Sequence, residues 1–121
     1  MFKKYLINPV PKPRMTQRDK WKKRPIVMRY RDFCDQCREQ QVFIPLDGST
    51  VVFIIPMPDS WSKKKKMEME DKPHQQKPDL DNLIKAVLDA IYLDDEKVWN
   101  LHAVKRWGHS GAICVAQDVN Y

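Results

Sequence analysis

One segment of the 121-residue chain, 77–91, constrains the fold more than any other, because it joins an acidic pair to an amphipathic helix. Apolar residues recur at helical spacing after Asp81, a residue type that favours helix N-caps. We therefore expect a helix that begins after Asp81 and ends at about Ile91, with Lys85 and Asp89 off its buried stripe. The stripe consists of Leu83, Ile84, Val87, Leu88 and Ile91.

The acidic pair before this helix is Asp79 and Asp81, one on each side of Leu80. Pro78 biases Lys77 toward an extended conformation, which the next three residues can continue. Residues two apart on an extended backbone point to the same side, so the two carboxylates are predicted to project together while Leu80 anchors the segment in the core. Two convergent carboxylates repel each other unless a cation lies between them, and hard oxygen ligands suit Mg²⁺ or Mn²⁺.

Further charged residues lie near this pair. Lys85 follows Asp81 by four residues and can reach the same side of the helix, and a short turn could return Asp94 or Asp95 to the pair. Each feature also has a plainer explanation: Asp81 caps the helix, Lys85 pairs with Asp81 or Asp89, and 94–95 is a polar turn. Their combination in a basic chain favours a metal site.

The net charge of +6 favours a polyanionic partner, with nucleic acid ahead of an anionic membrane. No apolar run approaches the ~20 residues of a membrane span. There is no long basic amphipathic helix, and the apolar part of the N-terminus is too short for a signal peptide. We therefore expect a cytoplasmic protein without membrane association, folded as one domain over residues 1–121.

Two segments concentrate the positive charge. Residues 9–25 begin with alternating prolines that fix an extended backbone, and their basic run includes Trp21, which is typical of a solvated loop or of an arm that follows DNA phosphates. Residues 63–66 are four lysines at the start of a short helix that Ser62 could cap, where they oppose the helix dipole. The residues expected to contact DNA are Lys12, Arg14, Arg18, Lys20, Lys22, Lys23, Arg24, Lys63, Lys64, Lys65, Lys66 and Lys77.

The remaining patterns predict an α/β (α+β) domain with one small mixed sheet packed with helices, in the order β-α-β-α-α-β-β. Residues 50–55 are a β-branched run suited to a strand covered on both faces, and 98–107 with 112–116 predict a C-terminal hairpin. Residues 71–76 are predicted to be a polar loop with an exposed His74. The predicted strands are 3–7, 50–55, 98–107 and 112–116, and the predicted helices are 26–41, 63–71 and 82–91.

The three cysteines are predicted to be free thiols. Cys34 and Cys37 match a CxxC pattern, but a structural zinc site needs four ligands, and a thioredoxin-like pair needs a preceding strand, whereas this pair falls in a predicted helix. An odd number of cysteines without a secretion signal favours a reducing compartment.

Taken together, residues 77–91 and the following Asp94-Asp-Glu-Lys-Val98 resemble the signature of the RusA family of Holliday junction resolvases. Pro11-Lys-Pro-Arg14 and Ser60-Trp-Ser-Lys-Lys-Lys65 also resemble that family, so the resemblance covers most of the chain. It implies a RusA-like nuclease domain with its basic loop at 9–25 and its metal site within 77–98.

The resemblance also implies roles for particular residues. Lys85 would be an essential lysine, Asn82 a supporting residue, and Asp94 a supporting residue or alternative ligand. The essential acids, which would bind the metal, are Asp79, Asp81 and Asp95. The implied cofactor is Mg²⁺, for which Mn²⁺ can substitute. The implied activity is paired symmetric nicking of four-way DNA junctions by a homodimer, in DNA recombination and repair, frequently encoded by phage or prophage DNA.

Two other functions stay open on the residues alone. A structure-selective DNA-binding module would use the basic segments without cleaving DNA. A glycosyltransferase can bind Mn²⁺ and a sugar nucleotide through Asp-x-Asp, although this chain leaves little room for a nucleotide-binding domain. The nuclease explains both charge types, since basic segments hold the DNA backbone while carboxylates hold a metal that activates water and stabilises the charge developing on the phosphate.

Overall fold

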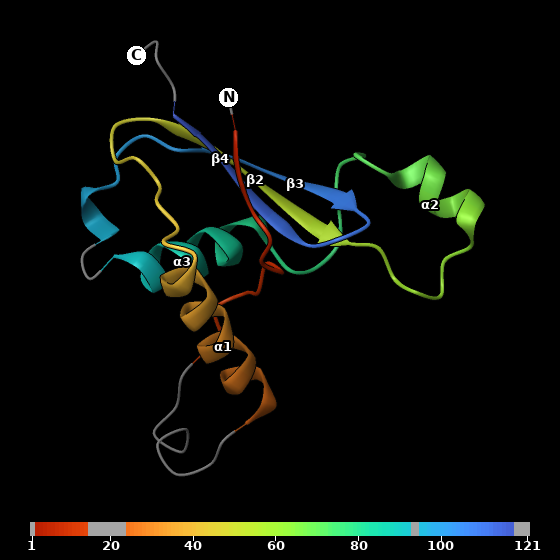
Figure 1. Ribbon diagram of the computed structural model, residues 1–121, viewed down its shortest axis with the longest axis horizontal. Helices are drawn as coiled ribbons and strands as arrows, with labels where there is room; N and C mark the ends of the chain where they lie inside the picture. Colours follow the sequence, from red (N-terminus) through yellow and green to blue (C-terminus); the bar gives the residue numbers. More distant parts are fainter. Residues whose placement is uncertain (1, 15–23, 93–94, 118–121) are drawn as a thin grey trace.

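The computed structural model describes residues 2–14, 24–92 and 95–117, with the backbone alone at residue 95. The described residues form helices and a four-stranded mixed sheet in the predicted order, which confirms the α/β class (Figure 1). The strands are β1 (Lys3–Tyr5), β2 (Ser49–Pro56), β3 (His102–Gly108) and β4 (Ala112–Gln117). The helices are α1 (Pro25–Glu39), α2 (Lys63–Met69) and α3 (Leu80–Ile91), followed by the 3₁₀ turn η2 (Asp95–Lys97). Within the described ranges, no helix combines the length and apolar composition needed to cross a membrane.

The sheet has the strand order β1-β4-β2-β3, with β2 parallel to β3 and β4 antiparallel to both β1 and β2. The predicted C-terminal hairpin is therefore wrong, because β2 lies between β3 and β4. Val52, for example, is opposite Val104 on one side and Cys114 on the other. A continuous β-branched strand such as β2 is suited to the centre of a sheet, where both of its edges are paired.

Two glycines allow the chain to pass from β3 to β4 over the end of β2. A Cβ atom on Gly108 would lie 2.3 Å from Cγ2 of Ile54, and one on Gly111 would lie 1.9 Å from Oδ1 of Asn8. Any side chain at these positions would clash, so glycine is required by close packing. The two glycines thus lie in a connection between strands that are not neighbours in the sheet.

The core lies between one face of the sheet and the helices α1 and α3, which share that side (Figure 1). Alternate residues of β2, such as Val51 and Phe53, point into it. Among the described residues, the opposite face of β2 is covered only in part: Val52 is buried and Ile54 partly exposed, and both line an open surface pocket of about 350 Å³. The α3 stripe is confirmed: Leu83, Val87 and Leu88 are buried, and Ile84 and Ile91 pack against the core while partly exposed.

Residues 71–76 form the expected loop between α2 and α3, but 71–74 are hydrogen-bonded along the edge of β3. The amide of Asp71 donates to the carbonyl of Trp107 at 2.9 Å, the amide of Trp107 to Lys72 at 3.0 Å, and the amide of His74 to Lys105 at 3.1 Å. The prediction of an exposed His74 is wrong, because the side chain packs on Trp107 with ring centroids 4.2 Å apart and is 4% exposed. Burial and the nearby Lys105 charge lower the pKa of His74.

The cysteine prediction is confirmed for all three thiols, which form no disulfide. Cys37 faces the core from α1, and burial raises its pKa to about 12. A thiol with so high a pKa carries almost no thiolate, the form that binds metals and attacks disulfides. The CxxC pattern therefore reflects the buried face of a helix.

Candidate functional site

The acidic pair lies at the start of α3. The helix begins at Leu80, so Asp79 is its N-cap, in an extended conformation with φ −68° and ψ 145°, and Asp81 is in its first turn. The predicted helix start after Asp81, and the extended 79–81 segment on which the same-side argument relied, are therefore wrong. Both aspartates suit an N-cap, and the earlier start lets Leu80 pack against the core from within the helix.

Neither carboxylate of the pair has a structural role within the described residues. Asp79 makes no side-chain hydrogen bond to the helix that it precedes. Both side chains are exposed, and neither forms a hydrogen bond or ion pair with the described residues. The plainer explanation in which Asp81 caps the helix is thus not supported. Negative charge at this end of a helix is favoured by the helix dipole.

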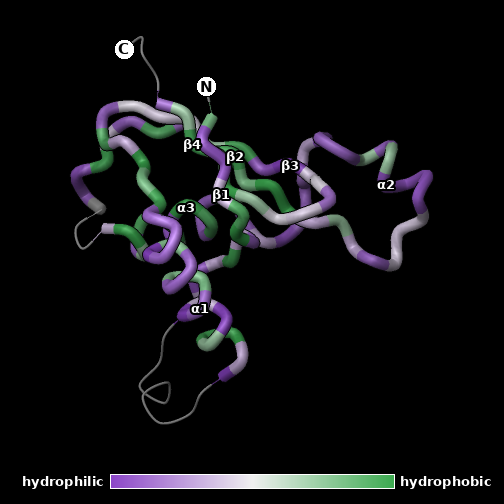
Figure 2. The backbone as a smooth tube through the Cα atoms, viewed as in Figure 1, coloured by the Kyte–Doolittle hydropathy of each residue, from purple (hydrophilic) through white to green (hydrophobic). Residues whose placement is uncertain are grey.

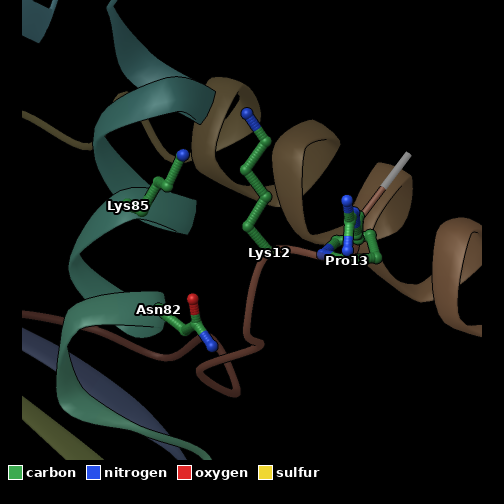
Figure 3. A pocket seen from close by; sticks show the side chains of 5 residues that line it. Lys12, Pro13, Asn82 and Lys85 are labelled. Atoms are coloured by element: carbon green, nitrogen blue, oxygen red, sulfur yellow. The ribbon is translucent and has the colours of Figure 1, made fainter. Parts of the chain in front are cut away.

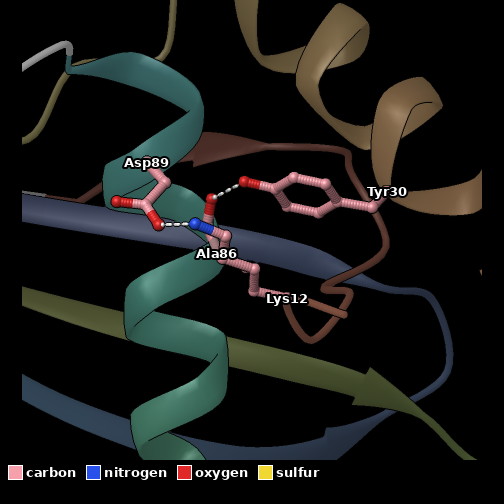
Figure 4. Close-up of polar contacts among 4 residues, drawn as sticks. All are labelled: Lys12, Tyr30, Ala86 and Asp89. Carbon is pink, nitrogen blue, oxygen red and sulfur yellow. Dashed lines mark hydrogen bonds and ion pairs between the residues drawn. The ribbon is translucent and has the colours of Figure 1, made fainter. Parts of the chain in front are cut away.

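Lys85 lies one turn after Asp81 on α3 and is exposed. The plainer expectation was an ion pair with Asp81 or Asp89, but Asp89 instead pairs with Lys12 from the N-terminal segment (Figure 4). No ion pair joins Lys85 to any residue that the structure describes. Its ammonium is therefore available to a ligand.

The N-terminal segment packs along α3 and encloses a basic pocket of about 510 Å³ with it (Figure 3). The amide of Lys12 donates to the carbonyl of Asn82 at 3.4 Å, and the ion pair with Asp89 fixes the other end of the Lys12 side chain. The pocket residues are Lys12, Pro13, Arg14, Asn82 and Lys85. Four of these were predicted site residues from two distant parts of the sequence, and three carry positive charge.

Helix α3 is itself held against α1. The buried hydroxyl of Tyr30 donates to the carbonyl of Ala86 at 3.2 Å (Figure 4), and burial raises the pKa of Tyr30 above its ordinary value. The helix that carries the acids and Lys85 is therefore fixed on two sides, by α1 and by the N-terminal segment.

Other predicted DNA-binding residues lie elsewhere. Ser62 caps α2 as expected, its hydroxyl accepting from the amide of Lys65 at 3.1 Å. Helix α2 buries no residue and projects from the body, well apart from α1 and α3 (Figure 1), and it is largely hydrophilic (Figure 2). Its four lysines, 63–66, are thus not brought to the acidic pair. Arg24 is exposed and donates to the carbonyl of Arg14 at 3.0 Å.

One residue near the site was not predicted. The ammonium of Lys105 donates to the carbonyls of Gln76 and Pro78, at 2.7 and 2.8 Å, in the segment that leads into Asp79. Alternation along β3 was the available signal, because it places Lys105 on the same face as Trp107 and therefore directs a lysine toward the helices. Lys77, a predicted DNA contact, is exposed between these two carbonyls, and its peptide bond to Pro78 is cis.

Comparison with known families decides the identity of the chain. Residues 7–116 match the family model described as Endodeoxyribonuclease RusA. The chain belongs to the RusA family. The match covers most of the chain and confirms the resemblance of the 77–91 segment. As a RusA-family member the protein is an endodeoxyribonuclease, and the glycosyltransferase interpretation is set aside. No curated protein sequence matches the chain.

The carboxylates of this RusA-family nuclease suit a hard divalent cation, since Asp79 and Asp81 present oxygen donors with no other partner among the described residues. Among the residues whose side chains are described, no three carboxylate, imidazole or thiol groups gather closely enough to hold one ion. Asp94 lies outside the described residues, and Asp95 is described only as the first backbone position of η2. The predicted third ligand is therefore untested, as are Arg18, Lys20, Lys22 and Lys23, which lie outside the described ranges.

Proposed function

We propose that this RusA-family endodeoxyribonuclease resolves four-way DNA junctions by Mg²⁺-dependent, paired nicks, acting as a homodimer. The observation that carries the proposal is that α3 bears both the carboxylates that could bind a metal and the polar residues that could bind a phosphate. The acids Asp79 and Asp81 stand at its N-terminus without a partner among the described residues, and Asn82 and Lys85 line the basic pocket beside them.

The pocket supports the binding of a DNA phosphate close to the acids. Arg14 and Lys85 contribute charged donors and Asn82 an amide, while Lys12 is partly neutralised by Asp89 and fixes the pocket wall. A helix rises about 1.5 Å per residue, so Lys85 is about 6 Å along the axis from Asp81. A phosphate held by Lys85 would therefore lie within reach of a cation held at the helix start.

We assign the metal to Asp79 and Asp81, with Asp95 or Asp94 as a third carboxylate ligand. Mg²⁺ bound there would supply a water of lowered pKa and stabilise the charge that develops on the scissile phosphate. Lys85 would offset the same charge from the pocket side, and Asn82 would orient a phosphate oxygen. Arg14 would hold the DNA backbone in place.

The distribution of positive charge supports a branched substrate. Helix α2 projects away from α3, which carries two of the pocket residues (Figure 1), so α2 and the pocket can each contact a different duplex arm. Phosphate contacts of this kind fix the position of DNA without reading its sequence. A four-way junction has two-fold symmetry, and a two-fold dimer would present one acidic site to each of two opposed strands.

The test is cleavage of a four-way junction labelled in each strand in turn, beside a linear duplex of the same sequence. With Mg²⁺ we expect two nicks at symmetric positions in the junction and little cleavage of the duplex, and with a chelator we expect none. Equal cleavage of the duplex would contradict the junction preference, and absence of junction cleavage in any divalent metal would contradict the proposal as a whole.

A further inference from the structure

Lys105 connects the sheet to the segment that precedes the acidic pair through both its main chain and its side chain. Its carbonyl accepts from the amide of His74 at 3.1 Å, the last backbone hydrogen bond between β3 and residues 71–74. Its ammonium then donates to Gln76 at 2.7 Å and Pro78 at 2.8 Å. Among the described residues, no backbone hydrogen bond joins 75–78 to β3. Beyond His74, the hydrogen bonds from β3 to this segment are therefore made by the Lys105 side chain.

The environment of Lys105 differs from that of an ordinary surface lysine. It lies on the helix-facing side of β3 and is half-buried, and it pairs with no carboxylate among the described residues. Its two acceptors are main-chain carbonyls, which are present whatever side chains occupy 76 and 78. The Lys105 ammonium therefore fixes the main chain at Gln76 and Pro78 and does not depend on their side chains.

The carbonyl of Pro78 belongs to the peptide unit that includes the nitrogen and Cα of Asp79. Because a peptide unit is planar, fixing the orientation of this carbonyl fixes the position of the Asp79 Cα atom. The other end of Asp79 is fixed by α3, whose residue Leu83 donates its amide to the Asp79 carbonyl at 3.2 Å. Asp79 is thus held on both sides, by Lys105 and by the helix.

We propose that Lys105 is a positioning residue for Asp79, which it holds in the orientation that binds a divalent cation; the inference rests on the proposed role of the acidic site. Groups that orient metal ligands without touching the ion typically change metal affinity or activity by about 10–100-fold when they are removed. In this role Lys105 does not contact the reacting atoms, so its effect is exerted through Asp79.

The test measures Mn²⁺ binding to the whole chain without DNA, by electron paramagnetic resonance of the free ion, for wild type and Lys105→Met. We expect affinity to fall about 10–100-fold in Lys105→Met. Most of the affinity should return in Lys105→Arg, which restores a cationic donor. The matched control is Arg106→Met, which removes the neighbouring positive charge from the opposite face of the sheet. The Mg²⁺ concentration that gives half-maximal junction cleavage should rise in parallel with the decrease in Mn²⁺ affinity.

The melting temperature and junction binding without metal separate positioning from folding. If Lys105→Met folds and binds Mn²⁺ as tightly as wild type, the inference is overturned. It is also overturned if Lys105→Met melts early while its folded fraction keeps full affinity. Should Lys105→Met not fold, Lys105→Gln takes its place with the same expectations. Wild type that binds Mn²⁺ through Asp79 but cuts no junction would contradict the proposed function and leave the Lys105 inference standing.

Discussion

Asp79 occupies the N-cap of α3 without using its carboxylate to cap the helix. A capping aspartate typically stabilises a helix by about 0.5–2 kcal/mol relative to alanine, a contribution that this side chain does not make through a hydrogen bond. The carboxylate is instead left exposed beside that of Asp81, in a protein with net positive charge. The Asp79 carboxylate, which makes no capping hydrogen bond although it stands at the N-cap, is the feature that most favours a metal-binding role.

Lys85 is expected to act on the reaction more than on DNA binding. Replacing it with alanine should lower the junction cleavage rate by about 10²–10³-fold, the usual decrease when one donor to a developing negative charge is removed. Junction affinity should change little, because other basic residues remain. Single-turnover cleavage and a gel-shift assay measure the two quantities.

The control for Lys85 is Arg31→Ala, which removes an exposed positive charge of α1 that does not line the pocket. It should cleave at the wild-type rate. Wild-type cleavage by Lys85→Ala, or a decrease in cleavage matched by an equal decrease in binding, would contradict a role in the chemical step.

His74 gives the fold a specific acid sensitivity. Burial lowers its folded-state pKa below the ordinary value of 6.5, so above that pH both folded and unfolded forms are neutral and the residue contributes nothing to pH dependence. As the pH falls below 6.5, the unfolded chain takes up a proton that the folded chain does not. Stability should therefore fall by up to about 1.4 kcal/mol per pH unit until the folded-state pKa is reached.

Urea unfolding of wild type and His74→Phe between pH 7.5 and 5 tests this directly. The phenylalanine can keep the packing on Trp107 but cannot take up a proton, so its stability should decline less over that interval. His102→Gln, which changes an exposed histidine, should keep the full wild-type decline. A decline in His74→Phe as steep as that of wild type would contradict the assignment.

Among the elements, α2 contributes no buried residue to the core. Its aromatic neighbour Trp61 packs on Trp107 of the body at a centroid distance of 4.7 Å. Lys65 lies over the Trp61 ring, 4.3 Å from its centroid, so this lysine contributes to the local packing. Of the other three lysines, Lys63 and Lys64 are exposed and Lys66 is partly exposed, so their side chains can reach phosphates.

Replacing Lys63, Lys64 and Lys66 together with glutamine should weaken junction binding and reduce its salt dependence. For each phosphate that the variant no longer binds, the slope of log affinity against log salt should become shallower by about 0.9. The melting temperature should not change, since no buried residue is altered. Affinity measured at several salt concentrations gives the slope, and Glu68→Gln on the same helix is the control. An unchanged slope would exclude α2 from the DNA interface.

The elements themselves were predictable where a local pattern dictates them. The apolar stripe of α3, the Ser62 cap of α2 and the β-branched run of β2 each correspond to an observed feature. Strand pairing was not predictable in the same way, because β3 and β4 are close in sequence and yet separated by β2. That arrangement depends on long-range pairing and on close contacts at two glycines, which a turn pattern cannot distinguish from a hairpin.

The site was predictable to a similar extent. The residue types of the pair and of Lys85 indicated a metal-dependent nuclease, and the family match bears out the enzyme class. The helix start was misplaced because Asp79 and Asp81 are equally suitable N-caps. The Lys12–Asp89 ion pair, which fixes one residue of the basic pocket, joins residues 77 positions apart, and the Lys105 hydrogen bonds cross from a strand to a loop. Such interactions exist only in the folded chain.

At the scale of the whole molecule, paired nicking requires two sites in one complex. We expect the chain to sediment as a dimer at the concentrations at which it cuts junctions, with the two nicks appearing in concert. A mixed dimer of wild type and Asp81→Asn should nick one strand of each junction. A monomer by sedimentation that still cuts both strands in concert would contradict the dimer.

We expect the acids at the start of α3 to carry out the reaction and the basic residues to bind DNA independently of them. The most direct measurement compares wild type with Asp81→Asn on one labelled four-way junction, for cleavage with Mg²⁺ and for binding without it. We predict that Asp81→Asn loses cleavage while its binding is unchanged or tighter, because a carboxylate that faces phosphate has been removed. Wild-type cleavage by Asp81→Asn would contradict a catalytic role for the acidic pair.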